Sequence, residues 1–262
     1  MNIHDFMGMK KEGRKITVVT AYDYWTARIV EKSEVDCVLV GDSVAMVVHG
    51  YPSTVHATTA MMALHTQAVA RGLKKKFLIG DMPFLSFRKG LHTALDCVEA
   101  LMGAGAQAVK LEGVWGHEDV VEGIIKSGVP VMGHIGLTPQ SVHQLGGFRV
   151  QGTDKKTAED LLRQAARLEA LGCFSLVLEC VPSDLAAQIT DSIEIPTIGI
   201  GAGPSVSGQV LVLQDLLGMD SGFKPKFLRG FLNGEDLIKT ALDKYRKEVQ
   251  MGTFPNSQES YS

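Results

Sequence analysis

The chain has 262 residues, 45% of them hydrophobic and 21% charged, and its 26 Lys and Arg against 29 Asp and Glu give a formal net charge of −3. This hydrophobic content excludes an intrinsically disordered chain, and the charge balance argues against a nucleic-acid-binding surface, which needs a basic excess. No apolar stretch approaches the roughly 18 residues that span a bilayer, and the first residues lack the apolar core of a secretory signal.

The four cysteines form no CxxC pair and are expected to be free thiols in a reducing compartment. We therefore expect a cytoplasmic protein that binds neither nucleic acid nor membrane.

Short apolar runs rich in Val and Ile, separated by Gly-containing segments, predict buried parallel strands. In chain order these runs are Ile16–Thr20, Cys37–Val40, Phe77–Gly80, Ala108–Leu111, Val129–Gly133, Ser175–Leu178, Thr197–Ile200 and Val210–Leu213. Helical patterns fill most of the gaps, at residues 58–72, 91–102, 117–125 and 157–171 and from about residue 233 onward. In the last of these, apolar side chains at helical spacing are expected to face inward: Leu237, Ile238, Ala241, Leu242 and Tyr245.

Strands that alternate with helices predict an α/β fold with a parallel sheet and right-handed crossovers. Eight such strands favour a closed (β/α)8 TIM barrel, and a doubly wound open sheet is the alternative. We expect one barrel domain over residues 1–251 and a flexible polar tail over residues 252–262.

Polar residues close or follow five of the predicted strands. In a barrel the carboxyl ends of the strands form the mouth where reacting groups gather. The residues at these ends are Asp42, Ser43, Asp81, Lys110, Glu112, His134 and Glu179. A carboxylate directly after a buried run is costly unless it is paired or bound to a metal. A helix cap or a solvated loop would explain one such strand, but five that behave alike favour a site.

The chemistry of this set points to a hard cation. Two or three carboxylates suit Mg²⁺, and the absence of Cys and of paired His at these ends argues against zinc. A Mg²⁺ ion there can chelate the carboxylate and keto oxygens of a 2-oxo acid and stabilise its enolate, to which Lys110 would add positive charge. The residues alone thus predict a metal-assisted, enolising barrel enzyme.

Nine stretches, in order along the chain, resemble the ketopantoate hydroxymethyltransferase family. They are TAYDYWTA, LVGDS, GDMPF, AVKLEG, GHIGLTPQ, GGFRVQG, LVLECVP, IPTIGIGAG and GQVLV. The resemblance implies a barrel of the phosphoenolpyruvate/pyruvate type that assembles as a homodecamer. It also implies transfer of a hydroxymethyl group from 5,10-methylenetetrahydrofolate to 3-methyl-2-oxobutanoate, which gives 2-dehydropantoate for pantothenate and coenzyme A biosynthesis.

The resemblance also implies roles for residues of this chain. Asp42 and Asp81 match aspartates that bind Mg²⁺ and, through it, substrate, and Glu112 matches an outer carboxylate of the metal site. Ser43 and Lys110 match substrate-binding residues. Two further positions complete the match: Glu179 corresponds to the proton acceptor, and His134 lines the substrate pocket.

Some features leave alternatives open. Ser207 stands where the family commonly has Asp, which puts a local turn or a contact near the mouth in doubt, and Gln214 lies at a position that varies in the family. A C–C lyase or mutase of the same superfamily, acting on a 2-oxo acid, is the alternative function, although no cysteine lies in a motif that matches such lyases. A barrel that only binds a ligand is a third possibility, but it predicts loss of one of the metal-site acids.

Overall fold

The computed structural model describes residues 1–219 and 225–261. Residues 220–224, in the predicted barrel domain, and Ser262, in the predicted tail, lie outside the described residues. The chain divides into two compact units, Met1–Val212 and Leu213–Ser262. None of the helices described is both long and apolar enough to span a membrane.

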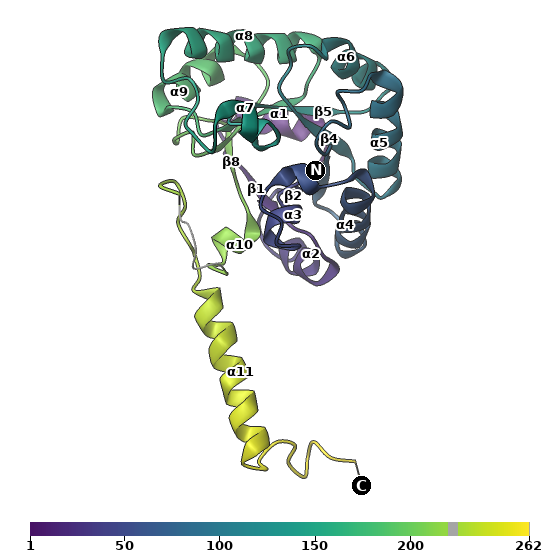
Figure 1. Ribbon diagram of the computed structural model, residues 1–262, viewed down its shortest axis with the longest axis vertical. Coiled ribbons are helices and arrows are strands. Elements are labelled where there is room, and N and C mark those ends of the chain that lie inside the picture. The colour runs from purple at the N-terminus through teal and green to yellow at the C-terminus, as the bar shows by residue number, and fades with distance from the viewer. Residues whose placement is uncertain (220–224, 262) are drawn as a thin grey trace. The chain divides into compact units, whose positions relative to one another are not determined.

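The first unit is a closed parallel barrel of eight strands, which confirms the predicted fold (Figure 1). The strands are β1 (Ile16–Thr20), β2 (Cys37–Val40), β3 (Phe77–Asp81), β4 (Ala108–Glu112), β5 (Val131–Gly136), β6 (Ser175–Glu179), β7 (Thr197–Ile200) and β8 (Gly208–Leu211). Each strand pairs with the next, and β1 pairs with β8. The pairing of β1 with β8 closes the sheet and excludes the doubly wound alternative.

Five strands differ from their predicted bounds: β3, β4 and β6 each end one residue later than expected, and β5 and β8 are shifted. β5 begins two residues later than expected and continues past His134 to Gly136, because His134 is a side chain of the barrel interior and not a terminator. β8 begins two residues earlier, at Gly208, which pairs with Ile16. A Cβ atom at Gly208 would lie 2.3 Å from the carbonyl oxygen of Ile16, so only glycine allows this approach.

Helices follow most strands and neighbour one another around the barrel (Figure 1). In the first unit they are α1 (Ile3–Lys11), α2 (Tyr24–Glu31), α3 (Val44–Val47), α4 (Thr59–Gly72), α5 (Leu91–Gly103), α6 (Glu118–Lys126), α7 (Val142–Leu145), α8 (Lys155–Leu171) and α9 (Ser183–Ser192), with short 3₁₀ helices η1 (Thr54–His56) and η2 (Pro139–Ser141). Capping residues set the ends of two predicted helices. Thr58 is the N-cap of α4 and Asp154 the N-cap of α8, and Gly172, at φ +99°, is the C-cap of α8.

The amino-terminal helix α1 packs against the end of the barrel opposite the mouth. Its Phe6 is fully buried in a cluster with Phe77 and Phe174. Phe77 is the first residue of β3, and Phe174 immediately precedes β6. Their rings meet edge to face, with centroids 5.3 to 6.0 Å apart. This end of the barrel is therefore a packed core, and a reaction site is expected at the mouth, the other end of the barrel.

Ser207 belongs to the closed end of the barrel. It immediately precedes β8, and its backbone N–H donates to Thr197 Oγ1 at 3.2 Å while its own Oγ accepts from the backbone N–H of Thr197. The expected effect near the mouth is therefore wrong. The serine hydroxyl instead joins the starts of β7 and β8.

The second unit contains α10 (Leu213–Leu216) and α11 (Gly234–Gln250). The apolar positions of α11 that were expected to face inward are exposed, including Leu237 at 56% and Leu242 at 62%. Phe254, in the predicted tail, packs on Tyr245 of α11 with ring centroids 5.6 Å apart. The division into a domain over 1–251 and a flexible tail over 252–262 stays a prediction.

Candidate active site

Acidic side chains gather where the strands of the barrel end. Asp81, Glu112 and Glu179 are the last residues of β3, β4 and β6, and Asp42 lies two positions after the end of β2. Asp42, Asp81 and Glu112 are each at most 5% exposed. The parallel register sets Asp81 beside Lys110 and Glu112 beside His134 on neighbouring strands. The predicted residues thus come together in one cluster.

Lys110 is the cation inside this cluster. Its Nζ lies 2.8 Å from Asp81 Oδ1 and 3.3 Å from His134 Nδ1. Burial alone would lower the pKa of Lys110, but Asp81, Glu112 and Asp42 raise the pKa above its ordinary value, so the ammonium stays charged. Burial also raises the pKa values of Asp81 and Glu112, and the neighbouring Lys110 only partly offsets this effect.

Gln140 links two of the acids, although the sequence analysis assigned it no role. Its side-chain Nε2 donates to Asp42 Oδ2 and to the carbonyl oxygen of Met82, both at 2.9 Å. Its backbone N–H donates to Glu112 Oε2 at 3.0 Å. Gln140 lies in η2, after β5, and thus fixes carboxylates that come from β2 and β4. Asp42 is held a second time, because its backbone N–H donates to Asp81 Oδ2 at 3.1 Å.

His134 separates Glu179 from the other acids. Burial, together with the charge on Lys110, lowers the pKa of His134 well below its ordinary value, so the imidazole is neutral. An ammonium group can only donate, so Nδ1 accepts from Lys110 and the ring proton lies on Nε2. Nε2 lies 3.2 Å from Glu179 Oε2. Within the described part of the chain Nε2 makes no hydrogen bond, so the neutral ring approaches the Glu179 carboxylate without bonding it.

Glu179 has the pKa of a base that works near neutral pH. Burial raises the pKa of its carboxyl to about 7, and the charge on Lys110 limits the rise. Its side chain is 18% exposed, against 2% for Glu112 and Asp81. Such a carboxylate can accept a proton from a bound substrate and return it to water.

Ser43 connects this cluster to the segment that follows β1. Its Oγ lies 2.8 Å from the hydroxyl of Tyr22, which follows β1, and Ser43 immediately precedes α3. Tyr22 is buried and lies in the TAYDYWTA stretch, and no role was predicted for it from the sequence. Its phenol fixes the serine hydroxyl next to Asp42.

The cluster has the composition of a site for a divalent cation. Three of its four carboxylates are almost fully buried with one lysine, and Glu112 Oε1 has no hydrogen-bond partner within the described part of the chain. Uncompensated buried carboxylates are costly, and a hard cation offsets this cost. Among the described residues, no three His, Cys, Asp or Glu side chains are already arranged around one ion position. The acids of the cluster could hold such an ion if other oxygens completed its shell.

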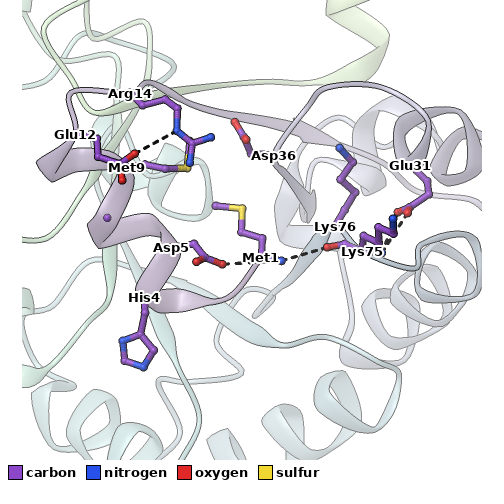
Figure 2. Close-up of a pocket in the computed structure, with 11 residues that line it drawn as sticks. Met1, His4, Asp5, Met9, Glu12, Arg14, Glu31, Asp36, Lys75 and Lys76 are labelled. Carbon is purple, nitrogen blue, oxygen red and sulfur yellow. Dashed lines mark hydrogen bonds and ion pairs between the residues drawn. The ribbon is translucent and has the colours of Figure 1, made fainter.

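A separate cavity of about 430 Å³ lies at the closed end of the barrel (Figure 2). Most of its charged groups bind one another or the backbone: Glu31 accepts from the N–H of Lys74 and Lys75, Asp36 accepts from Thr17, and the Met1 ammonium donates to the Lys75 carbonyl. None of the predicted site residues lines it. We therefore assign the chemistry to the mouth.

Comparison with known proteins agrees with this geometry. The sequence profile described as ketopantoate hydroxymethyltransferase matches residues 1–257. The chain belongs to the ketopantoate hydroxymethyltransferase family. It is 58% identical over 257 residues to the 3-methyl-2-oxobutanoate hydroxymethyltransferase of Coxiella burnetii strain RSA 493, an alignment that covers 98% of this chain and 97% of the relative. The corresponding enzyme of Bdellovibrio bacteriovorus is 55% identical, with 99% of both chains covered.

Solved structures with little sequence similarity share the fold of this family member. A phosphonopyruvate hydrolase in complex with oxalate and Mg²⁺ aligns with a TM-score of 0.64 at 12% identity, covering 99% of this chain and 93% of the other. A 2,3-dimethylmalate lyase of the PEP mutase/isocitrate lyase superfamily aligns with a TM-score of 0.62 at 14% identity, covering 99% and 91%. These likenesses show a shared barrel, and the family membership rests on the sequence.

Proposed function

We propose that this chain transfers a hydroxymethyl group from 5,10-methylenetetrahydrofolate to 3-methyl-2-oxobutanoate, giving 2-dehydropantoate and tetrahydrofolate, with Mg²⁺ as its metal. Family membership supports the reaction. The observation that carries the proposal is the placement of Glu179, a carboxylate with a pKa of about 7, beside a cluster of buried acids and one lysine.

The proposed mechanism begins at C3 of the 2-oxo acid. Glu179 takes the C3 proton, and Lys110 stabilises the negative charge that develops on the enolate oxygen. Asp42 and Asp81 would hold the Mg²⁺ ion, with Glu112 as an outer carboxylate, and Ser43 and His134 would contact the substrate. When bound, the ion supplies a Lewis acid for the carboxylate and keto oxygens.

The second half of the reaction forms the C–C bond. The enolate carbon attacks the methylene carbon as one of its two C–N bonds to the folate breaks, and the oxygen of one water molecule replaces the second C–N bond to give the hydroxyl group. The proton that Glu179 took from C3 and one proton of the water balance the two nitrogens of the released tetrahydrofolate. The neutral ring of His134 lies 3.2 Å from the Glu179 carboxylate and adds no charge that would favour or oppose its protonation.

The alternative C–C lyase or mutase gains no support from the thiols. Cys180 directly follows Glu179, but burial raises the pKa of this thiol to about 11, and burial raises the pKa of Cys173 to about 12. Cys37 and Cys97 are also buried, and burial raises the pKa of both thiols. A thiol with such a pKa is protonated at neutral pH and is a poor catalyst.

The two halves of the reaction can be tested apart. The protein is incubated with Mg²⁺ and 3-methyl-2-oxobutanoate in D₂O, and loss of the C3 proton signal is followed by NMR. We expect exchange without folate and 2-dehydropantoate when methylenetetrahydrofolate is added. Glu179→Gln should abolish exchange but leave Mg²⁺ binding intact. Retained exchange in this variant would remove Glu179 from its role, and no exchange in the unmodified protein would contradict the proposed function.

The proposal extends to assembly and location. We propose a homodecamer, which follows from the family resemblance, and a cytoplasmic location, which follows from the four cysteines being free. Sedimentation velocity of the purified protein tests the assembly, since a decamer of 28.3 kDa subunits is easily separated from a dimer or monomer.

A further inference from the structure

Two neighbouring cavities open beside the acid cluster. The smaller, of about 370 Å³, is lined by Glu112 and Gln140 of the cluster itself. The larger, of about 510 Å³, is lined by Gly136, which pairs with Glu179 in the sheet. Arg88, Ser141 and Gln144 line both cavities, so the two share a wall. We call the pair the Arg88 groove.

The groove meets the acids on both sides of His134. At one end it reaches Glu112, and at the other it reaches the backbone beside Glu179, because a Cβ atom on Gly136 would lie 2.3 Å from the carbonyl oxygen of Glu179. A molecule in the groove therefore contacts Glu112 at one end and lies near the backbone of Glu179 at the other. No role has been given to this space so far.

Large apolar side chains are exposed along the groove. Phe84 is 40% exposed and Leu85 39% in the smaller cavity, and Trp115 is 42% exposed in the larger. Leu85 also has a left-handed backbone, with φ +61°, a conformation that is unfavourable for a branched side chain and often marks functional loops. Exposed aromatic and apolar walls are typical of cavities that bind flat organic molecules.

Trp115 is fixed although it is exposed. Its indole Nε1–H donates to Asp160 Oδ2 at 3.3 Å, and its backbone carbonyl accepts from Arg88 at 3.0 Å. Asp160 is itself held by Gln164 at 2.7 Å and by Arg163 at 2.9 Å. Because hydrogen bonds hold both the indole N–H and the backbone of Trp115, its ring loses little conformational freedom when a ligand stacks on it.

Polar groups lie at the edges of the groove. Ser141, His143, Gln144 and Gln164 offer donors and acceptors, and the guanidinium of Arg88 uses one N–H for Trp115 and another for the Glu112 carbonyl out of five. Thr157 lines the larger cavity at the start of α8, next to the exposed Lys155 and Lys156. The groove therefore joins apolar walls to an amide-rich edge, and two exposed lysines follow the larger cavity at the start of α8.

We propose that the Arg88 groove binds the reduced-folate cosubstrate, with the bicyclic pterin in the smaller cavity and the aromatic stem against Trp115. This inference rests on the proposed function. A pterin is flat and has an amide-like edge, its stem is aromatic, and its tail carries carboxylates, which matches the walls, the edge and the lysine end in that order. This orientation also brings the one-carbon unit beside Glu112, where the enolate must meet it.

The two tryptophans of the chain provide a direct binding test. Trp25 lies on α2, is 64% exposed and lines neither cavity of the groove. Trp25→Phe leaves Trp115 as the sole fluorophore, and Trp115→Phe leaves Trp25. On titration with tetrahydrofolate, we expect saturable quenching in the first variant and none in the second. Equal quenching in both, or none in either while the unmodified protein still makes product, overturns the groove assignment.

Kinetics then separate the groove from the chemistry. Trp115→Ala, and Gln144→Phe, which fills the groove from an exposed position, should raise KM for methylenetetrahydrofolate about tenfold or more, as expected when a stacked ring is lost. KM for the 2-oxo acid and C3 proton exchange without folate should keep their unmodified values, and Trp25→Ala is the matched control. Unchanged folate KM in both groove variants, or loss of exchange together with folate binding, contradicts the inference. Failure of the unmodified protein to exchange or form product instead contradicts the proposed function.

Discussion

Gln140 gives the sharpest test of how the acid cluster is held. It is 5% exposed, and its Nε2 donates to the Asp42 carboxylate and to the Met82 carbonyl, both at 2.9 Å. A hydrogen bond to a charged group contributes about 1.5–3 kcal/mol and one to a neutral group about 0.5–1.5 kcal/mol. Gln140→Met keeps the length of the side chain but removes both donors. We therefore expect the free energy of unfolding to fall by about 2–4.5 kcal/mol.

The same substitution should also slow enolisation. Asp42 would lose its side-chain restraint, and a catalytic carboxylate that shifts by about 1 Å can lower a rate on the order of a hundredfold. C3 proton exchange in D₂O measures this rate, and urea denaturation measures the stability. At about 2–4 °C per kcal/mol, the melting temperature should fall by roughly 4–18 °C.

Gln209→Met is the matched control for this variant. Its Nε2 also donates to a backbone carbonyl, that of Gly203 at 2.8 Å, but at an exposed position where water replaces the lost bond. We expect its free energy of unfolding to change by less than about 1 kcal/mol. If Gln140→Met were as stable as this control, or exchanged the C3 proton at the unmodified rate, Gln140 would not hold the cluster as argued.

Three further predictions concern charge. First, C3 proton exchange should rise about tenfold per pH unit below pH 7 and level off above it, because only ionised Glu179 accepts a proton and its pKa is about 7; a flat NMR rate profile from pH 5 to 8 would contradict this. Second, Lys110→Met should lower the free energy of unfolding by about 3–5 kcal/mol, and by more at pH 8 than at pH 5.5. Lys110 now partly offsets the raised pKa values of Asp81 and Glu112; without it the folded variant binds still more protons than its unfolded state, so it loses more stability as pH rises. Urea curves that show a pH-independent loss would refute this prediction. Third, Mg²⁺ at a hundred times its dissociation constant should stabilise the protein by about 2.7 kcal/mol, EDTA should reverse the effect, and Asp42→Asn should abolish it; an unchanged melting temperature would remove the metal from this site.

The sequence predicted the barrel because its strands are short and continuous in Val and Ile. β1, β2 and β7 have the predicted bounds, since apolar runs there end sharply at polar residues or glycine. The helices α1, α2 and α9 were not predicted, although α2 and α9 bury apolar residues at helical spacing. The inward face expected for α11 was wrong: a helical stripe shows that a surface can be buried, but not what buries it.

The candidate site was predictable to the extent that charge marks it. Asp42, Asp81, Lys110 and Glu179 stand out because a charged residue at the end of a buried run needs an explanation. Gln140 does not, because an amide after a Thr-Pro pair is an ordinary loop residue in sequence. Its contacts with β2 and β4 arise only when the loop after β5 folds back over the mouth, and this is decided by tertiary packing.

The arrangement of charges supports the proposal that Glu179, among the four acids, is the base. Asp81 and Glu112 are 2% exposed and share Lys110, so neither can easily exchange a proton with water. Glu179 lies beyond the neutral imidazole of His134, where the charge on Lys110 limits but does not cancel the rise of its pKa, and its side chain is 18% exposed. A base must return its proton to solvent after each turnover, and a dication bound by the sealed acids must not compete for it. Burying the metal-site acids and leaving Glu179 at the edge meets both requirements.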